Sequence, residues 1–221
     1  MSAPSRRFAT GQRCPLCQGA ETQLFHAAPA RDYLRCVRCL LVFVPPAFHL
    51  DPVAEKAHYD THDNRPDDPG YRRFLARLAD PLADRLEPGS SGLDFGCGPG
   101  PCLALMLEEQ GHRVALHDAY YRPAPEVFAA RHDFITATEV IEHLSRPGPV
   151  LDQLWSCLKS GGWLALMTSR LTADTDFARW YYKNDPTHIA FFAAETFHWL
   201  AARWGAEPIF VDPAVVLLQK S

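Results

Sequence analysis

A short apolar strand pattern runs directly into a glycine-rich turn at residues 92–100, GLDFGCGPG, and this junction constrains the fold more than any other feature. Glycine at every second position allows positive φ angles and brings backbone N–H groups close to a ligand, because no Cβ stands in the way. The dinucleotide-binding fingerprint would need a further glycine at position 101, where the chain has proline. Pro101 instead suits the first turn of a helix, which we predict over residues 102–110. The junction therefore predicts a strand, a ligand-binding turn and a helix, and it argues against hydride transfer.

The remainder of the chain alternates between strand and helix patterns. Strands are predicted at residues 93–94, 113–117, 134–138 and 163–168, with helical segments between them. This alternation predicts an α/β fold with a parallel sheet and helices on both faces. Ligands bind such sheets at the carboxyl ends of the strands, where the glycine turn, Asp118 and Glu139 all fall. Residues 207–211 and 215–219 predict a terminal hairpin, and residues 71–86 carry the apolar stripe of a helix that packs on the sheet.

The glycine turn, followed 18 residues after Gly100 by Asp118, resembles the class I S-adenosylmethionine-dependent methyltransferases. The resemblance implies a Rossmann-like, mostly parallel sheet with an antiparallel terminal strand. In that family the turn holds the methionine and ribose parts of the cofactor, and the acidic residue after the second strand accepts hydrogen bonds from both ribose hydroxyls. The residues expected to bind S-adenosylmethionine are Asp94, Gly96, Gly98, Gly100, Asp118 and Glu139. Only fourteen residues separate Asp118 from Asp133, where the family places a helix, a third strand and an adenine-binding loop, so no adenine contact is predicted.

Four of the seven cysteines form two pairs, Cys14/Cys17 and Cys36/Cys39, with eighteen residues between the pairs. This spacing is typical of a structural zinc site, in which each pair lies on a tight turn and the intervening residues form a hairpin. Four thiolate ligands leave no open position on the metal, so the zinc would not be catalytic. Two disulfides are the alternative, but a cytoplasmic chain keeps its thiols reduced. The pattern resembles the N-terminal zinc modules of bacterial small-molecule methyltransferases, including deoxysugar C-methyltransferases, and those of certain ribosomal RNA methyltransferases.

The chain divides into three parts: a zinc ribbon over residues 1–46, a helical cap or linker over residues 47–89 and the methyltransferase domain over residues 90–221. Residues 58–71 mix aromatic and polar side chains, which suits a flap over a ligand. No apolar run approaches the ~20 residues of a membrane span, and residues 1–11 lack the apolar core of a signal peptide. We therefore expect a cytoplasmic protein.

The segment ATEVIEHL, which follows the strand predicted at residues 134–138, holds the candidate catalytic residues Glu139, Glu142 and His143. At the start of a helix, offsets of three and four residues would place these side chains on one face. Two carboxylates and an imidazole suit magnesium or manganese with positions left for a substrate oxygen, and His188 is expected to fold back as a fourth ligand. The pattern is similar to two families of metal-dependent O-methyltransferases, those of ubiquinone biosynthesis and those that methylate the terminal ribose of small RNAs. It also occurs in class I methyltransferases that bind no catalytic metal, and without one His143 or His188 is the best general base.

The methyl acceptor is predicted to be a small molecule, with oxygen as a candidate atom, because the net charge is −4 and no basic groove is evident. Large aromatic residues between positions 177 and 192 predict an apolar lid over that acceptor. Two alternatives stay open. The first is an RNA-modifying enzyme whose nucleic-acid contact comes from Arg6, Arg7, Arg13, Arg31, Arg35 and Arg38. The second is a non-catalytic S-adenosylmethionine-binding scaffold or regulatory subunit whose zinc module docks a partner.

Overall fold

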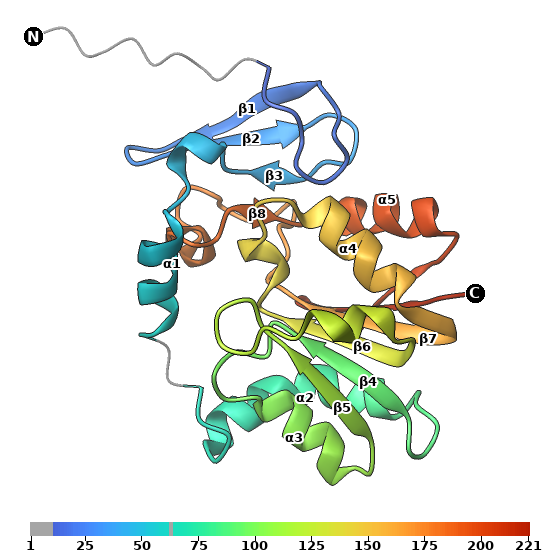
Figure 1. Cartoon of the computed structure of the whole chain (residues 1–221). Helices are drawn as coiled ribbons and strands as arrows, with labels where there is room; N and C mark the ends of the chain where they lie inside the picture. The colour runs from blue at the N-terminus through green and yellow to red at the C-terminus, as the bar shows by residue number, and fades with distance from the viewer. Residues whose placement is uncertain (1–10, 62–63) are drawn as a thin grey trace, which may run out of the picture.

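Two β-sheets organise the computed structural model, which describes residues 11–61 and 64–221 (Figure 1). The large sheet contains, in spatial order, β5 (Arg113–His117), β4 (Ser91–Phe95), β6 (His132–Thr138), β7 (Leu158–Met167), β10 (Val215–Gln219) and β9 (Pro208–Phe210). The small sheet contains β1 (Thr22–Ala27), β2 (Asp32–Cys36), β3 (Val42–Phe43) and β8 (Ala190–Phe191). The α-helices are α1 (Pro52–Tyr59), α2 (Pro69–Ala83), α3 (Cys102–Glu109), α4 (Pro147–Ser156) and α5 (Ala194–Trp204). Short 3₁₀ helices are η1 (Pro46–Phe48), η2 (Pro125–Ala129), η3 (Ile141–His143) and η4 (Tyr181–Asn184).

The large sheet has the predicted Rossmann-like topology. Strand β4 pairs in parallel with β5 and β6, and β6 pairs in parallel with β7. Strand β10 pairs antiparallel with both β7 and β9, which confirms the terminal hairpin and the antiparallel last strand. The nearly continuous burial of β6 and β10 is expected of strands whose two faces are both covered. The helix predicted after the glycine turn is α3, which begins at Cys102 as expected.

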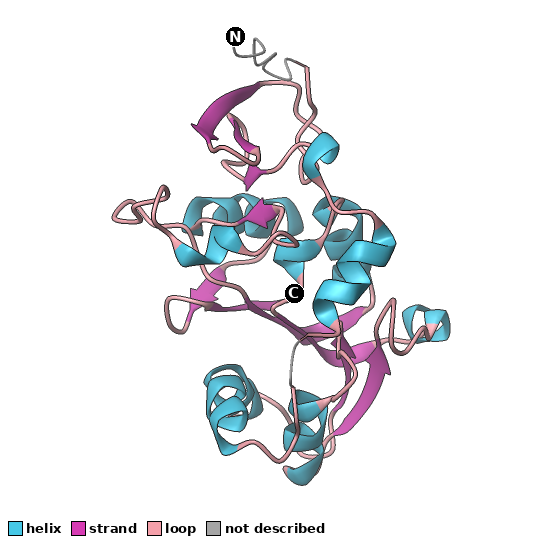
Figure 2. Cartoon of the chain, turned by 90° about the vertical axis from the view of Figure 1, so that its left-hand side faces the viewer, coloured by secondary structure: helices cyan, strands magenta, loops and turns pink. Residues whose placement is uncertain are grey.

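Helices cover both faces of the large sheet, as Figure 2 shows from the side. On one face, buried leucines of α2 pack with α3 and with Phe134 and Trp163 of the sheet, which confirms the apolar stripe predicted over residues 71–86. On the other face, α4 and α5 lie between the large sheet and the cysteine module, which we define as residues 11–44. No helix in the described ranges is long and apolar enough to cross a membrane.

The cysteine module shares a sheet and a core with the rest of the protein. Strand β3 pairs antiparallel with β8, so that Phe43 lies opposite Ala190. Gly148, in the first turn of α4, lies so close to the main chain of Leu16 that a Cβ there would overlap it. Leu16 also belongs to the same buried cluster as the inner residues of α4 and α5. The module is therefore fixed against the large sheet and its helices.

Strand β5 forms one edge of the large sheet, because the chain described between β5 and β6 contains no further strand. An isolated bridge between Asp118 and Arg122 and the short helix η2 occupy this stretch. The fourteen residues before Asp133 are thus too few for a third strand, as the sequence indicated.

Candidate active site

The glycine turn follows the carboxyl end of β4, which lies between β5 and β6 in the large sheet. Gly96 and Gly98 have φ angles of +75° and +63°, a region that favours glycine. The amide of Gly96 donates to the carbonyl of His117 over 2.7 Å, and a Cβ on Gly96 would overlap the side chain of Val140. A Cβ on Gly98 would instead meet open space. The turn is therefore packed against the sheet at Gly96 and open at Gly98, where backbone groups can approach a ligand.

Gly100 packs closely against another part of the main chain. A Cβ at this position would overlap the carbonyl oxygen of Asn64, in the segment that leads into α2. That segment belongs to the flap predicted over residues 58–71, of which His62 and Asp63 lie outside the described residues. Packing against Asn64 explains the glycine without a ligand, so a cofactor contact at Gly100 stays a prediction.

Asp118 follows β5 and turns its carboxylate towards the glycine turn. Its Oδ2 accepts a hydrogen bond from the amide of Gly98 at 3.0 Å. Its Oδ1 accepts from the amides of Tyr120 and Tyr121 at 2.8 and 3.0 Å. Since each carboxylate oxygen has more than one lone pair, Asp118 can accept further hydrogen bonds while it holds this position. The structure thus brings together the two features that the sequence assigned to the cofactor.

Asp94 lies in β4, directly before the turn, and it is only 4% exposed. Burial raises the pKa of Asp94 to about 6, while a hydrogen bond from Thr136 favours its charged form. The Thr136 hydroxyl donates to Asp94 Oδ1 over 2.8 Å from the neighbouring strand β6. Asp94 therefore links β4 to β6 directly before the glycine turn, and its contact with the cofactor stays a prediction.

The prediction that a helix begins at Glu139 is wrong. Glu139 has a φ of +52°, and a single 3₁₀ turn, η3, spans Ile141–His143. A left-handed residue cannot continue into an α-helix, so Glu139 and Glu142 do not share a helix face. They are brought together by Tyr182, whose hydroxyl lies 3.1 Å from Glu139 Oε2 and 2.6 Å from Glu142 Oε1. The same residues therefore converge, but through a long-range contact.

Burial controls the charge of this carboxyl pair. It raises the pKa of Glu139 to about 7, even though the hydrogen bond from Tyr182 favours the ionised form. It raises the pKa of Glu142, which is fully buried, well above the usual value, and the nearby charge of Glu139 adds to the shift. Among the described residues, Glu142 Oε2 has no hydrogen-bond partner. The pair therefore retains a proton near neutral pH.

His143 and His188 lie beside the carboxyl pair, with their ring centres 4.7 Å apart. Each ring directs Nδ1 at a main-chain carbonyl: His143 at that of Thr187, 3.2 Å away, and His188 at that of Tyr182, 2.7 Å away. One ligand atom from each of Glu142, His143 and His188 lies within 4.8 Å of the others. Glu139 does not belong to this cluster, so the predicted four-residue metal set becomes a three-residue set.

Asp185 and His58 belong to the same site. Sequence reasoning assigned neither of them a catalytic role, although His58 is the first residue of the predicted flap. Asp185 Oδ2 lies 3.2 Å from His58 Nε2 and 3.9 Å from His188 Nε2. Burial opposes the charge of Asp185, but hydrogen bonds from Thr187 and the charge of His188 outweigh it and hold the Asp185 pKa well below its usual value. Asp185 stands three residues before His188, which is a weak local signal. His58 comes from α1, and no sequence pattern links it to this segment.

The apolar lid predicted from the aromatic residues is wrong for most of them. Phe177 packs edge-on against Tyr33 of the cysteine module, with ring centres 4.9 Å apart. Phe191 and Phe192 are fully buried. These rings fill the interface between the module and residues 171–193, so they are core residues. Of the predicted lid, Tyr182 reaches the carboxyl pair.

The four paired cysteines gather at one end of the cysteine module. The Sγ atoms of Cys14 and Cys39 are 3.4 Å apart, as are those of Cys17 and Cys36, and all four lie within 4.8 Å of one another. A disulfide needs about 2.05 Å, so the thiols are free. Tetrahedral zinc with bonds of ~2.3 Å places sulfurs ~3.8 Å apart, which this cluster fits. The hairpin predicted between the pairs is formed by β1 and β2.

The basic surface of the RNA alternative is not assembled as expected. Arg31 is only 9% exposed, and its guanidinium donates to main-chain carbonyls inside the protein. Arg35 and Arg38 lie over aromatic rings of the protein. Arg6 and Arg7 lie outside the described residues. The prediction that Arg31 contacts nucleic acid is therefore wrong, because this side chain is buried and donates its hydrogen bonds within the protein.

Comparison with known proteins identifies the family of this chain. Residues 65–209 match the family model of the methyltransferase domain. The chain belongs to this family. Together with the fold, the match identifies the chain as a methyltransferase. No curated protein sequence matches this methyltransferase.

Solved structures support the methyltransferase fold. One is 1,6-didemethyltoxoflavin-N1-methyltransferase of Burkholderia thailandensis with bound 1,6-didemethyltoxoflavin and S-adenosylhomocysteine, at 16% identity and a TM-score of 0.56, covering 90% of this chain and 99% of that one. Another is magnesium protoporphyrin IX methyltransferase of Synechocystis PCC 6803 with bound S-adenosylhomocysteine, at 16% identity and a TM-score of 0.51, covering 69% and 84%. A third is an O-methyltransferase family protein of Burkholderia thailandensis, at 14% identity and a TM-score of 0.52, covering 79% and 62%.

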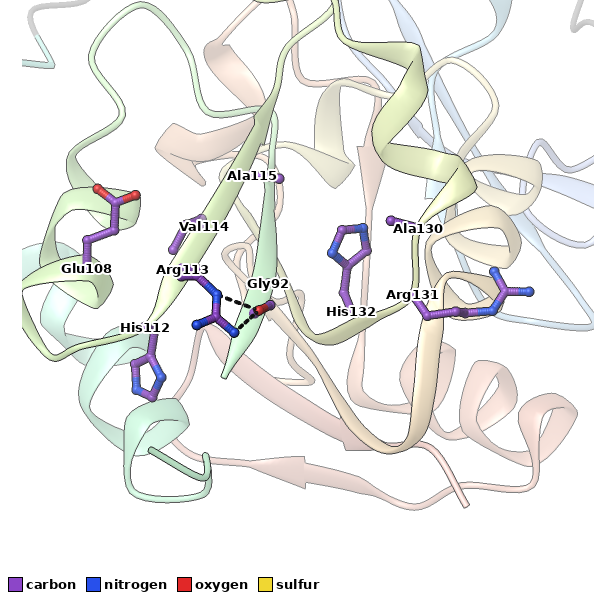
Figure 3. Close-up of a pocket in the computed structure, with 10 residues that line it drawn as sticks. Gly92, Glu108, His112, Arg113, Val114, Ala115, Ala130, Arg131 and His132 are labelled. Carbon is purple, nitrogen blue, oxygen red and sulfur yellow. Dashed lines mark hydrogen bonds between the residues drawn. The ribbon is translucent and has the colours of Figure 1, made fainter. Parts of the chain in front are cut away.

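A cavity of about 530 Å³ lies elsewhere in this methyltransferase, at the amino ends of β4, β5 and β6 (Figure 3). Its walls include Gly92, His132 and Arg113, whose guanidinium donates to Ser91 Oγ over 2.9 Å. The glycine turn and Asp118 lie at the opposite ends of the same strands. Because ligands of such sheets bind at the carboxyl ends, this cavity is not the cofactor site.

Proposed function

We propose that this methyltransferase transfers the methyl group of S-adenosylmethionine to an oxygen atom of a small-molecule acceptor. The observation that carries the proposal is the convergence of Glu142, His143 and His188 at the carboxyl edge of the sheet. Val140 lies within the same short segment and packs against Gly96 of the glycine turn. Groups that can accept a proton therefore lie next to the turn that we assign to the cofactor.

The cofactor assignment rests on the main-chain geometry of the glycine turn that follows β4. We assign the methionine and ribose parts of S-adenosylmethionine to the open side of the turn at Gly98 and to the carboxylate of Asp118. Three amides already hold that carboxylate in place, so it is oriented before any ligand binds. Contacts from Asp94, Gly100 and Glu139 are part of the same proposal.

The chemistry asked of the protein is modest. S-adenosylmethionine supplies a methyl group that is already activated as a sulfonium, so the protein must chiefly align the acceptor and exclude water. As the acceptor oxygen bonds to the methyl carbon, the O–H proton must leave, and we assign His143 or His188 to take it at Nε2. The carbonyls that face Nδ1 of each ring favour the tautomer with the proton on Nδ1 and a basic Nε2. Ionised Asp185 would stabilise a protonated His188.

The charge around the site supports a small acceptor over RNA. Asp185 lies on the acceptor side, and its ionised carboxylate repels a phosphate backbone. Arg31, the buried member of the predicted basic surface, is unavailable to nucleic acid. Two of the similar solved structures are named for small acceptors, 1,6-didemethyltoxoflavin and magnesium protoporphyrin IX, which agrees with this choice. The free thiols of the cysteine cluster suit a reducing compartment, so we further propose a cytoplasmic location.

A second candidate is a metal-assisted version of the same reaction. Glu142, His143 and His188 fit a divalent cation such as magnesium or manganese, because they converge and because the buried Glu142 Oε2 has no partner among the described residues. Such an ion would lower the pKa of an acceptor hydroxyl. The two histidines would then be ligands, and neither would serve as the base.

Incubation with S-adenosylmethionine carrying a labelled methyl group tests the proposal directly. We expect label in small phenolic, enolic or carboxylic acceptors and none in total cellular RNA. Replacing His188 with Ala should abolish transfer and leave cofactor binding intact, whereas the same replacement of His198, an exposed residue of α5, should change neither. Label in RNA alone, or no binding of S-adenosylmethionine, would refute the proposal. Addition of magnesium or manganese after mild chelation separates the two versions, since the second predicts that activity returns with the ion.

A further inference from the structure

Arg31 lies in the turn between β1 and β2 of the cysteine module, and its side chain contacts the segment of residues 183–186, which includes Asp185. Its Nη1 donates to the carbonyl of Pro186 over 3.0 Å, and its Nη2 donates to the carbonyl of Asp185 over 2.6 Å and to that of Lys183. Its Nε donates to the hydroxyl of Tyr33 over 2.9 Å. One buried guanidinium therefore binds three carbonyls within four consecutive residues.

These carbonyls lie between the two residues that matter most for the site, Tyr182 and His188. The main-chain oxygen of Asp185 contacts Arg31, whereas the carboxylate of the same residue contacts His58 and lies near His188. The ring of His188 is in turn held by the carbonyl of Tyr182 at 2.7 Å. The path of this main chain thus decides where Tyr182 and His188 point.

The cysteine module also holds the far end of the same segment. Strand β8 follows His188 by one residue and pairs with β3 of the module (Figure 1). Tyr33, next to β2's first residue, adds a hydrogen bond from its hydroxyl to the carbonyl of Lys183 at 3.3 Å. The segment from residue 181 to 191 is therefore fixed by the module at both ends.

We propose that Arg31 is a positioning residue of the active site: through the carbonyls of residues 183–186 it sets the orientation of Tyr182 and His188 for methyl transfer. This inference rests on the proposed function of the same site. The planar guanidinium suits the task because its several donors lie in a rigid fork, whereas a lysine ammonium is a compact charge on a flexible stem. The cysteine module then contributes to catalysis from outside the methyltransferase sheet, without touching the cofactor or the acceptor.

Arg31→Met tests the role, with Arg31→Lys as the variant that keeps the charge. Arg38→Met is the matched control, because Arg38 belongs to the same module but lies over the ring of Trp199. We expect Arg31→Met to speed hydrogen exchange in residues 181–189, to lower kcat by at least about tenfold and to leave the affinity for S-adenosylmethionine unchanged. Arg31→Lys should retain a higher kcat than Arg31→Met. Addition of millimolar guanidinium should raise the kcat of Arg31→Met, whereas the same concentration of sodium chloride should not.

Several results would overturn the role. They are a normal kcat in Arg31→Met at temperatures where it is folded, an equal loss in Arg38→Met, and unchanged hydrogen exchange over residues 181–189. A loss of cofactor affinity that matches the loss of kcat would likewise show a general structural effect. If the wild-type protein methylates no small molecule, the proposed function fails, while the exchange experiment still decides whether Arg31 orders the segment.

Discussion

The two sides of the proposed active site are built in different ways. On the cofactor side, the glycine turn and Asp118 come from one continuous stretch, residues 92–118, and the sheet brings them into contact. On the acceptor side, His58, Glu142 and Asp185 come from three separate parts of the chain, and the cysteine module holds one of them in place. A local motif can thus be read from sequence, whereas an assembled site depends on packing between distant segments.

Loss of the cysteine cluster should have the largest effect. We expect about one zinc per chain, and Cys36→Ala should remove it and destabilise the protein by several kcal/mol, since zinc binding in small domains is worth about 10 kcal/mol or more. Elemental analysis and thermal unfolding measure the two effects. Cys157→Ala, a buried cysteine outside the cluster, is the control. A wild-type protein without zinc, or equal stability of the two variants, would contradict the prediction.

Substitution of Asp118 should affect the cofactor side alone. Asp118→Ala removes hydrogen bonds to a charged acceptor, each worth about 1.5–3 kcal/mol, so affinity for S-adenosylmethionine should fall by about 100-fold. Isothermal calorimetry measures the loss. The exposed Asp174→Ala serves as a control for the change of charge. Unchanged binding in Asp118→Ala would rule out the ribose assignment and break the contrast between the two sides.

The same contrast explains how far the sequence could predict the structure. The strand at residues 113–117 and the start of α3 are predicted correctly, because apolar alternation and Pro101 act locally. The terminal hairpin is predicted for the same reason. The cysteine spacing likewise predicts the cluster, because a tetrahedral set of ligands constrains the turns that carry it.

The acceptor side could be predicted only in part. Glu142, His143 and His188 do converge, but the helix expected at Glu139 is replaced by a left-handed residue and a 3₁₀ turn. Arg31 looked like a surface cation, because nothing local shows that the carbonyls it binds lie about 150 positions later in the chain. Tertiary contacts of this kind override local propensity, and no spacing rule encodes them.

The carboxyl pair offers a pH test of the acceptor side. The pKa of Glu139 is about 7 in the folded protein against a usual 4.5, so the folded state keeps a proton that the unfolded state releases. Stability from this proton is present at low pH and is lost as pH rises from about 4.5 to about 7. Glu139→Gln has no such proton to lose. Its free energy of unfolding relative to that of the wild type should therefore be higher at pH 8 than at pH 4 by on the order of 3 kcal/mol.

Thermal unfolding of both proteins across this range measures the difference. Glu195→Gln, which changes an exposed carboxyl on α5, should follow the wild type at every pH. Parallel curves for Glu139→Gln and the wild type would mean that Glu139 is solvated in solution, and the close contact with Tyr182 would then be absent.

The smallest effect is expected at α1, the element that joins the two sides. Glu55 accepts hydrogen bonds from Tyr59, on the same helix, and from Tyr120, beyond β5, at 2.8 and 2.7 Å. Tyr59 also packs edge-on against His143, with ring centres 5.2 Å apart. No residue of α1 is buried, so a few such contacts hold this helix in place beside the proposed site. Tyr120→Phe removes one hydrogen bond of about 1 kcal/mol, so S-adenosylmethionine should dissociate about fivefold faster while the unfolding temperature barely changes.

Stopped-flow displacement of bound S-adenosylmethionine measures that rate. Tyr181→Phe is the matched control, because its ring is 74% exposed and lies on the acceptor-side segment. If both variants release the cofactor at the wild-type rate, α1 does not cover it. The two sides would then communicate chiefly through Val140, which follows Glu139 and packs against Gly96. A faster rate in Tyr120→Phe alone would instead show that α1 couples cofactor retention to the position of His143.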